Sequence, residues 1–305
     1  MRHGRVIEVG PRDGLQNEAA FVPTAIKLEF IQALASAGLA EIEVSSFVSP
    51  SRVPQLADAS QLWPLLPFGP RYSALVPNLR GLESALAVGV ERIAIFASAS
   101  EAFAQKNLNR SIDDSLREYR DVVNRFREIH SNGFVRGYVS MVFECPYQGP
   151  IDQDSVTRVI DSLWELGVNE ISLGDTVGRA VPCEVTRLGT HLLARNPAQG
   201  IGALVWHFHD TWGTAIANVQ AAIDLGFLTF DASAGGLGGC PFAPGAGGNL
   251  ATEDLVYLLE RQGISTGVDL NLLSRASLQV FQSLGRPPLA KAQRAKLAQD
   301  RQVLA

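Results

Sequence analysis

Cysteine is scarce in this chain of 305 residues, which has only Cys145, Cys183 and Cys240. An odd number of widely spaced cysteines with no C-x-x-C pair argues against a disulfide framework, so we expect three thiols and a reducing compartment. No apolar run is long enough to cross a bilayer, and the first residues enter a strand-like segment with no room for a signal sequence. These absences predict a cytoplasmic protein without a membrane partner.

Positive charge is neither abundant nor concentrated. Lys and Arg number 26 against 31 Asp and Glu, which gives a formal net charge of −5, and the basic residues form no run. The electrostatic signature of a nucleic-acid-binding protein is missing, so we expect no nucleic acid as a partner. No proline- or serine-rich stretch divides the chain, and 46% of its residues are hydrophobic, enough for a substantial core. We expect a single catalytic domain over residues 1–305.

Eight short runs rich in β-forming residues recur along the chain. They cover residues 5–10, 41–46, 71–76, 92–98, 135–143, 170–176, 204–210 and 229–235. Helical periodicity, with apolar residues at i, i+3, i+4 and i+7, fills most of the intervening segments. Several of these segments end in a glycine just before the next run, as expected at the helix C′ position. These glycines are Gly38, Gly89, Gly133, Gly167 and Gly226.

Alternating strands and helices predict a parallel sheet covered by helices. Eight such units within about 250 residues favour a (β/α)₈ TIM barrel, an α/β fold, over an open doubly wound sheet. The single glycine-rich loop supports this choice, because it follows the eighth strand, whereas a dinucleotide-binding fingerprint would follow the first. We expect the barrel to span about residues 5–262 and extra C-terminal helices to occupy about residues 263–305.

Two of the five histidines lie one residue apart in the stretch VWHFHDTWG, residues 205–213. Side chains at i and i+2 of a strand point to the same face, so His207 and His209 would project together while Trp206 and Phe208 pack behind. This geometry suits two ligands of one metal ion. Ordinary hydrogen-bonded histidines of a buried strand are the alternative, but Asp210 follows directly, and three such groups in an apolar setting are hard to satisfy.

The active site of a TIM barrel lies at the C-terminal ends of its strands, and polar residues gather at those positions. Glu43 lies inside the second strand, where an unpaired buried carboxylate is costly. It needs a cationic partner, and Arg12 is the expected one, although the PRDG stretch that contains Arg12 also reads as an ordinary solvated turn. The residues expected at this rim are Arg12, Asp13, Gln16, Asn17, Glu18, Glu41, Glu43, Asp175, His207, His209 and Asp210.

The glycine-rich loop after the eighth strand holds Cys240 and leads to Asn249. A cysteine is more often a small hydrophobic residue, but this loop is poorly suited to bury one, which favours a functional thiol. Asn249 is placed to cap the following helix, a role that does not exclude metal ligation. One aspartate, two imidazoles, an amide oxygen and waters suit Mg²⁺ or Mn²⁺ better than Zn²⁺, while Fe²⁺ stays open on ligands alone.

Seven runs of the sequence form one further pattern. They are VIEVGPRDGLQNE, IEVSSFVSP, ASEAF, RGYVSMVFECPYQG, EISLGDTVG, HFHDTWG and GGLGGCPFAPGAGGNLATEDLVYLLE. In this order they resemble the hydroxymethylglutaryl-CoA lyase family over about residues 5–285. The resemblance implies a divalent-metal-dependent lyase on a TIM barrel, which cleaves 3-hydroxy-3-methylglutaryl-CoA to acetyl-CoA and acetoacetate in leucine catabolism or ketone-body formation. An acyl-CoA substrate is expected, and homodimers are common in the family.

Carried onto this chain, the resemblance implies a set of site residues. The expected metal ligands are Asp13, His207, His209 and Asn249. The expected catalytic residues are Arg12, Cys240, Asp175, Glu43 and His207. The expected substrate contacts are Arg12 and Gln16.

The proposed chemistry gives these groups their roles. A metal ion lowers the pKa of the substrate hydroxyl, and Asp175 or His207, directly or through water, would remove its proton. Arg12, held by Glu43, would stabilise the negative charge that develops on the thioester enolate. Cys240 would protonate the departing carbanion, and the glycines around it would let the loop close.

Condensing enzymes of the same barrel superfamily, such as isopropylmalate and homocitrate synthases, are the nearest alternative. They typically read H-x-H-N-D and carry a Glu-Arg pair in the late loop, whereas here Asp210 follows His209 directly and Cys-Pro occupies the loop. A non-catalytic binding protein would have no reason to retain all the rim groups. Ala19 replaces a common lysine and Trp212 a common tyrosine, which leaves open a longer 3-substituted glutaryl-CoA substrate.

Overall fold

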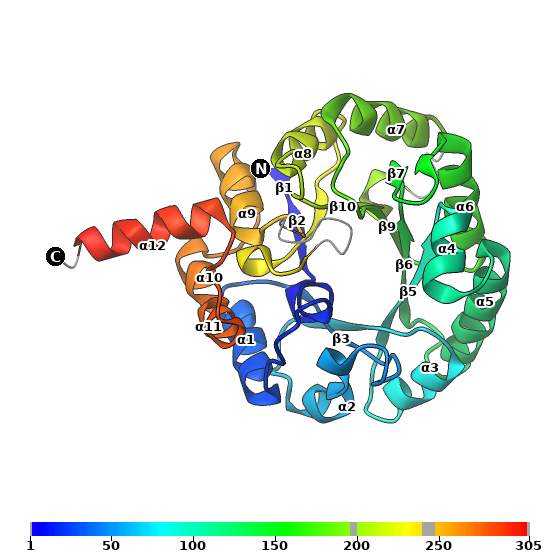
Figure 1. The fold of residues 1–305 in the computed structure, drawn as a ribbon, viewed down its shortest axis with the longest axis horizontal. Coiled ribbons are helices and arrows are strands. Elements are labelled where there is room, and N and C mark those ends of the chain that lie inside the picture. Colours follow the sequence, from blue (N-terminus) through cyan, green and yellow to red (C-terminus); the bar gives the residue numbers. More distant parts are fainter. Residues whose placement is uncertain (1, 196–199, 240–247, 304–305) are drawn as a thin grey trace.

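Eight parallel strands close into a barrel with helices around its outside, which confirms the predicted (β/α)₈ TIM barrel (Figure 1). This computed structural model describes residues 2–195, 200–239 and 248–303. The strand order around the barrel is β10-β11-β2-β3-β4-β5-β6-β9. These strands are β2 (Arg5–Glu8), β3 (Glu41–Ser46), β4 (Arg71–Leu75), β5 (Arg92–Ser98), β6 (Phe134–Ser140), β9 (Glu170–Asp175), β10 (Leu204–Phe208) and β11 (Thr229–Ala232).

Each predicted run overlaps one of these strands, but several strands end earlier than predicted. The first run was predicted to reach residue 10, whereas β2 ends at Glu8 and Gly10–Gly14 form a π-helical turn. The last run was predicted to reach residue 235, whereas β11 ends at Ala232 and Ala234–Gly236 form a 3₁₀ turn. Both irregular turns lie where the chain leaves a barrel strand, which is the end of the barrel where TIM-barrel sites form.

The helices follow the strands in the alternation that the sequence predicted. They are α1 (Thr24–Ser36), α2 (Ala59–Leu62), α3 (Leu79–Leu86), α4 (Glu101–Leu108), α5 (Ile112–Ile129), α6 (Gln153–Glu165), α7 (Pro182–Arg195), α8 (Ala215–Asp224), α9 (Thr252–Arg261), α10 (Leu270–Ala276), α11 (Leu278–Leu284) and α12 (Lys291–Val303). Among the residues that the structure describes, none of these helices is long and apolar enough to cross a membrane.

Side-chain caps mark the start of several helices. Asn78 accepts a hydrogen bond from the Gly81 amide at 2.9 Å, and Asp152 accepts one from the Ser155 amide at 2.7 Å. Each bond satisfies one of the amide donors that a helix N-terminus leaves without a partner.

Four of the five glycines predicted to end helical segments have positive φ values, between 78° and 95°. The prediction for Gly133 was wrong, because α5 already ends at Ile129. Gly133 is required for another reason. A Cβ atom at this position would lie 2.5 Å from the ring of Phe126.

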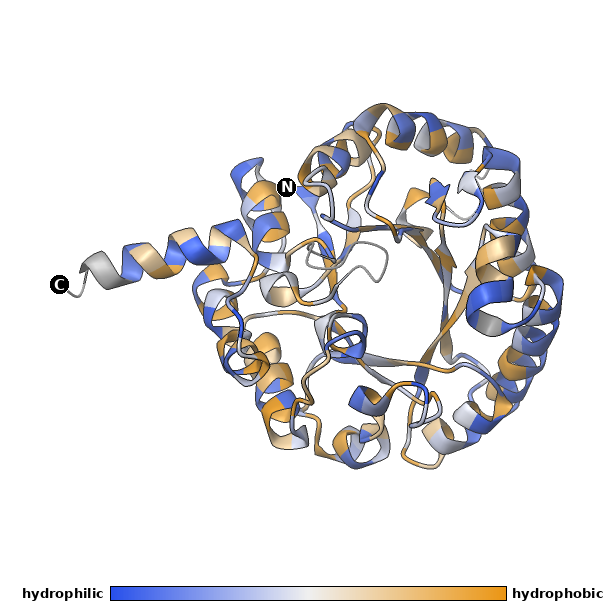
Figure 2. Cartoon of the chain, in the orientation of Figure 1, coloured by the Kyte–Doolittle hydropathy of each residue, from blue (hydrophilic) through white to orange (hydrophobic). Residues whose placement is uncertain are grey.

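The core fills the space between the barrel and its helices. The outer helices carry both hydrophobic and hydrophilic residues along their length (Figure 2), as amphipathic helices do. Trp206 is fully buried, stacks on Phe208 with ring centroids 5.4 Å apart, and meets the edge of Phe227 at 5.5 Å. The prediction that Trp206 and Phe208 pack behind the two histidines is therefore confirmed.

The start of the described chain pairs with a late segment beside the barrel. β1 (Arg2–His3) pairs in parallel with β12 (Ile264–Ser265), which follows α9. Helices α10 and α11 pack against α1, and α10 also packs against α9. Helix α12 begins beside α9 and α10 and then projects away from the barrel (Figure 1).

Ion pairs fill the N-terminal end of the barrel. Glu41 begins β3 and accepts hydrogen bonds from Arg5, from Arg71 at 2.7 Å and from Arg92 at 3.3 Å. Arg5 also donates to Glu170 at 2.6 Å. All five residues stand at or near the start of their strands, so Glu41 lies at the end of the barrel opposite the predicted rim. The inclusion of Glu41 among the rim residues was wrong.

We predict that Glu41→Ala lowers the free energy of unfolding by about 3 kcal/mol, because three arginines then converge without their shared carboxylate. Urea unfolding measures this loss. Binding of Mn²⁺ should be unchanged, since the substitution lies at the far end of the barrel. A variant as stable as the wild type would show that the arginines are satisfied by solvent instead.

Candidate active site and metal centre

A single π-helical turn presents the first site residues. The amides of Arg12, Asp13 and Gly14 all donate to the carbonyl of Val9, at 3.2, 2.7 and 3.2 Å. A Cβ atom at Gly14 would lie 2.7 Å from Ser233 Oγ. Glycine is therefore needed where this turn meets the segment that follows β11. Arg12 is 5% exposed. The alternative of a solvated turn is therefore wrong, because the turn is folded into the barrel mouth.

Arg12 lies between the carboxylates of Glu43 and Asp13. The sequence predicted the contact with Glu43. Its Nε donates to Glu43, and its Nη1 donates to Asp13 Oδ1 at 2.6 Å. The hydroxyl of Tyr138 donates to the other oxygen of Glu43 at 2.7 Å. Burial opposes the charge, but Glu43 and Asp13 outweigh it and raise the pKa of Arg12. Arg12 is thus a fixed, permanent cation.

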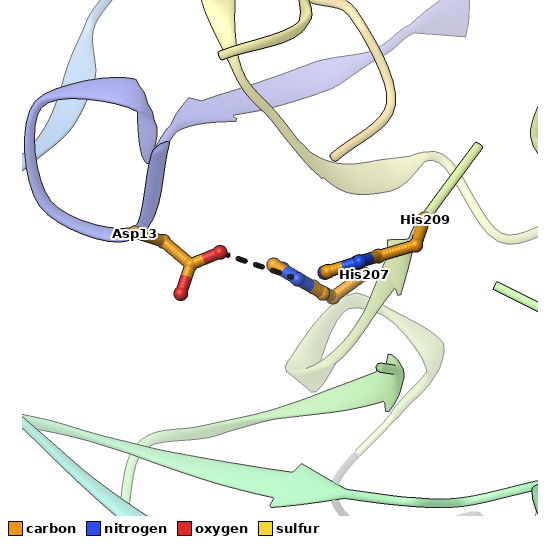
Figure 3. Close-up of side chains that lie close together, drawn as sticks. All are labelled: Asp13, His207 and His209. Carbon is orange, nitrogen blue, oxygen red and sulfur yellow. Dashed lines mark ion pairs between the residues drawn. The ribbon is translucent and has the colours of Figure 1, made fainter. Parts of the chain in front are cut away.

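Asp13, His207 and His209 form a cluster with metal-ligand geometry (Figure 3). Their ligand atoms lie within 4.8 Å of one another, and His207 Nε2 lies 3.8 Å from Asp13 Oδ2. The amide of Asn249 donates to the same oxygen of Asp13 at 2.9 Å. The N-cap of α9 is Ala251. Asn249 therefore does not cap that helix, and its amide belongs to the cluster.

Two buried polar atoms at this cluster have no hydrogen-bond partner among the described residues. They are Nδ1 of His209 and Oδ1 of Asn249. A buried polar atom without a partner is costly, and a cation beside both would remove that cost. A carboxylate, two imidazoles and an amide oxygen thus fit a divalent metal ion.

The protonation states of His209 and Asp13 also suit a cation. Burial, and then the nearby His207, lower the pKa of His209 to about 3, so its imidazole is neutral at physiological pH. Burial opposes ionisation of Asp13, but Arg12 and the two histidines outweigh it and lower the pKa of Asp13. A neutral imidazole and an ionised carboxylate are the forms that bind metals.

Asp175 is the last residue of β9. It pairs in the sheet with Phe208 of β10, the residue between His207 and His209. Its carboxylate accepts hydrogen bonds from the amides of Arg179 and Ala180, both at 3.2 Å. Burial outweighs these bonds and raises the pKa of Asp175 to about 7. A carboxyl group with such a pKa exchanges protons near neutral pH, as a general acid or base must.

A cavity of about 520 Å³ opens beside the cluster, within the range of small-molecule sites. The predicted residues that line it are Arg12, Asp13, Gln16, Asn17, His207 and His209. Tyr138, Arg52 and Arg110 line it as well. Trp212 is 61% exposed, and the Arg179 guanidinium lies over its ring, 5.5 Å from the ring centre. Neither Trp212 nor Ala19 lines the cavity.

Other predicted rim residues lie elsewhere. Glu18 pairs with Arg286. Asp210 accepts from the amide of Ala215 at 3.0 Å and from Lys291 at 3.3 Å, so its carboxylate turns away from the cluster. Cys240 lies outside the described residues. Cys145 and Cys183 are free thiols, as predicted.

Sequence reasoning missed the buried acids that hold the turns together. Glu8 accepts hydrogen bonds from the amides of Gly10 and Ala234 and from the Thr252 hydroxyl, at 2.8, 2.9 and 2.7 Å. Glu253 accepts from the Gly235 amide at 3.0 and 2.8 Å. Both are fully buried. A carboxylate inside a buried strand was the signal that identified Glu43, and the same signal applies to Glu8.

We predict a pH-dependent stability difference between the wild type and Glu253→Gln. Burial raises the pKa of Glu253 to about 8 from its ordinary 4.5. The folded state therefore retains a proton that the unfolded state has lost, so the contribution of Glu253 to stability falls as the pH rises from about 4.5 to about 8. The glutamine variant lacks this contribution, and its stability should decline less steeply than that of the wild type. Urea unfolding at the two ends of the window would contradict the prediction if both proteins changed in parallel.

Comparisons with known proteins identify the family of this chain. The family model described as HMGL-like matches residues 4–280. Hydroxymethylglutaryl-CoA lyase from Pseudomonas mevalonii is 47% identical over 294 residues, which cover 96% of each chain. The mitochondrial hydroxymethylglutaryl-CoA lyase of Arabidopsis thaliana is 47% identical over 94% of this chain, which spans only 61% of that protein's length.

Solved structures agree as well. The crystal structure of hydroxymethylglutaryl-CoA lyase from Pseudomonas aeruginosa superposes with a TM-score of 0.93 and 44% identity, and covers 98% of both chains. An HMG-CoA lyase from Acinetobacter baumannii, solved with coenzyme A and 3-methylmalate, has a TM-score of 0.88 and 36% identity over 96% of this chain and 95% of that one. The chain therefore belongs to the hydroxymethylglutaryl-CoA lyase family.

Proposed function

We propose that this protein is a divalent-metal-dependent lyase that cleaves 3-hydroxy-3-methylglutaryl-CoA to acetyl-CoA and acetoacetate. The observation that carries the proposal is the Asp13, His207 and His209 cluster, with the unpartnered oxygen of Asn249 beside it and the buried cation of Arg12 adjacent. Family membership agrees with this activity. The reaction breaks the C2–C3 bond of the substrate.

The four residues Asp13, His207, His209 and Asn249 would hold the metal ion, which we propose is Mg²⁺ or Mn²⁺. A bound divalent ion supplies Lewis acidity that lowers the pKa of the substrate's tertiary hydroxyl. Gln16 donates to Asp13 Oδ1 at 2.7 Å and also lines the cavity. Gln16 is thus placed both to orient Asp13 and to contact the substrate.

Asp175 is the better candidate for the base that removes the hydroxyl proton, directly or through water. Its pKa of about 7 suits this task. The alternative, His207, directs one nitrogen to Asp231 at 3.1 Å and faces Asp13 with the other. Both nitrogens of His207 are therefore engaged, whereas the Asp175 carboxylate bonds only to backbone amides in the described structure.

Arg12 would stabilise the enolate that forms when the C2–C3 bond breaks. A cation held in place before the reaction needs no reorganisation as charge develops, and such groups give large rate effects. Glu43 holds Arg12 and is itself held by the Tyr138 hydroxyl, and Arg12 lines the cavity. Cys240 is proposed to protonate the departing carbanion. It follows Gly239, which lines the same cavity.

The placement of Asp210 directly after His209 in the sequence favours cleavage over condensation. Its carboxylate bonds away from the metal cluster, so the residue after His209 adds nothing to the ligand set. The homodimer and the cytoplasmic location stay predictions, and a longer 3-substituted glutaryl-CoA stays the alternative substrate.

We predict that the purified protein with Mg²⁺ or Mn²⁺ releases acetyl-CoA and acetoacetate from 3-hydroxy-3-methylglutaryl-CoA in a coupled assay. Treatment with a strong chelator should abolish turnover, and restored metal should recover it, because the metal provides the Lewis acid. Undiminished turnover after complete metal removal, verified by elemental analysis, would contradict the mechanism.

We also predict that Cys240→Ser lowers kcat by roughly 10²–10⁴, the range typical of a lost general acid. Affinity for Mn²⁺ should stay unchanged, because Cys240 is not a proposed ligand. Cys183→Ser is the matched control, since Cys183 is exposed on α7, and it should retain full activity. If both variants were equally active, the thiol of Cys240 would have no catalytic role.

A further inference from the structure

A buried carboxylate that the sequence analysis did not single out stands directly behind the metal cluster. Asp231 lies on β11, and the strand register pairs it with His207 on β10. Its Oδ2 lies 3.1 Å from Nδ1 of His207. The other ring nitrogen of His207 faces Asp13. His207 therefore stands between two carboxylates, one in the cluster and one behind it.

Besides its contact with His207, Asp231 is held by two neighbours. Arg136 donates to Oδ1, and Ser172 donates to Oδ2 at 2.7 Å. The Asp231 side chain is 0% exposed and that of Arg136 is 2% exposed. Glu170 lies 3.5 Å behind Arg136 and connects it to the ion pairs at the N-terminal end of the barrel. The carboxylate therefore has little freedom to rotate or shift.

The charge of Asp231 fixes the direction of its bond to His207. Its Oδ1 forms a buried ion pair with Nη2 of Arg136, and this pairing keeps the carboxylate ionised. An ionised carboxylate can only accept hydrogen bonds. In the neutral imidazole of His207, Nδ1 must therefore carry the proton, which leaves the lone pair on Nε2, the nitrogen that faces Asp13.

His209 provides a contrast within the same strand. Its Nδ1 is buried and has no partner among the described residues. No carboxylate selects its tautomer, so the two histidines are not equivalent. The contact with Asp231 fixes the tautomer of His207 before any metal ion binds.

We propose that Asp231 is a positioning residue for the metal site, which sets the tautomer and ring orientation of His207 so that Nε2 is available to the ion. The inference rests on the metal site of the proposed function. Carboxylates in this relation to a histidine ligand commonly raise metal affinity 10- to 100-fold. Arg136 and Ser172 contribute indirectly, because they hold Asp231 in place.

The first test reads the tautomer directly in the metal-free wild type. The protein is labelled with ¹⁵N-histidine, and the imidazole nitrogens are observed by NMR well above the ordinary imidazole pKa. His207→Gln assigns the signal among the five histidines. We expect His207 to be protonated on Nδ1. Protonation on Nε2 would overturn the proposal, and this measurement needs no variant of Asp231 that has to fold.

The second test measures Mn²⁺ affinity by calorimetry for Asp231→Asn, with Asp58→Asn as the matched control. Asp58 is also a buried carboxylate paired with a buried cation, Lys27, at 2.8 Å, but it lies between α1 and α2 and contacts no site residue. We expect Asp231→Asn to bind Mn²⁺ 10- to 100-fold more weakly, and Asp58→Asn to bind like the wild type. A folded Asp231→Asn protein with wild-type affinity would overturn the proposal.

The two proposals fail in different ways. A wild type that binds Mn²⁺ and shows the Nδ1 tautomer, but does not cleave 3-hydroxy-3-methylglutaryl-CoA, would refute the proposed function and leave the role of Asp231 standing. A wild type that cleaves the substrate, with an Asp231→Asn variant that binds Mn²⁺ equally well, would refute only the role of Asp231.

Discussion

The guanidinium of Arg12 lies between the carboxylates of Glu43 and Asp13 inside the barrel mouth, and the arrangement of the site depends on this contact. A buried cation needs anionic partners, and each partner here has a second task. Glu43 reaches the cation from β3 and also receives the Tyr138 hydroxyl. Asp13 faces the histidines of β10 with its other oxygen. One ion pair thus places a cation and a metal-ligand cluster side by side.

Buried carboxylates hold the surrounding turns in register with that pair. Glu8 joins the turn that carries Arg12 and Asp13 to the segment after β11 and to the start of α9. Asp231 stands behind His207 in the same way that Glu43 stands behind Arg12. The barrel interior is therefore rich in charged groups at both ends. The cluster at the C-terminal end is supported by a second layer that solvent does not reach.

The sequence predicted the barrel because strand runs alternate with amphipathic segments, and it predicted the Arg12–Glu43 contact because a buried acid needs a partner. The His207 and His209 pair followed from strand periodicity. Most partners of Asp231, Glu8 and Glu253 could not be predicted, because they come from remote strands and turns that local pattern does not specify. Glu41 was misplaced for a related reason. It shares a face of β3 with Glu43 but stands two residues earlier, at the other end of the barrel.

The central claim is that Asp13, His207, His209 and Asn249 bind one divalent ion. A crystal structure of the protein loaded with Mn²⁺, with anomalous diffraction data at the manganese edge, tests this most directly. The account predicts a single strong anomalous peak bound by these four residues, with Nε2 of His207 and Oδ1 of Asn249 as ligand atoms. A Mn²⁺ ion at another site, or none at this cluster under saturating metal, would contradict it.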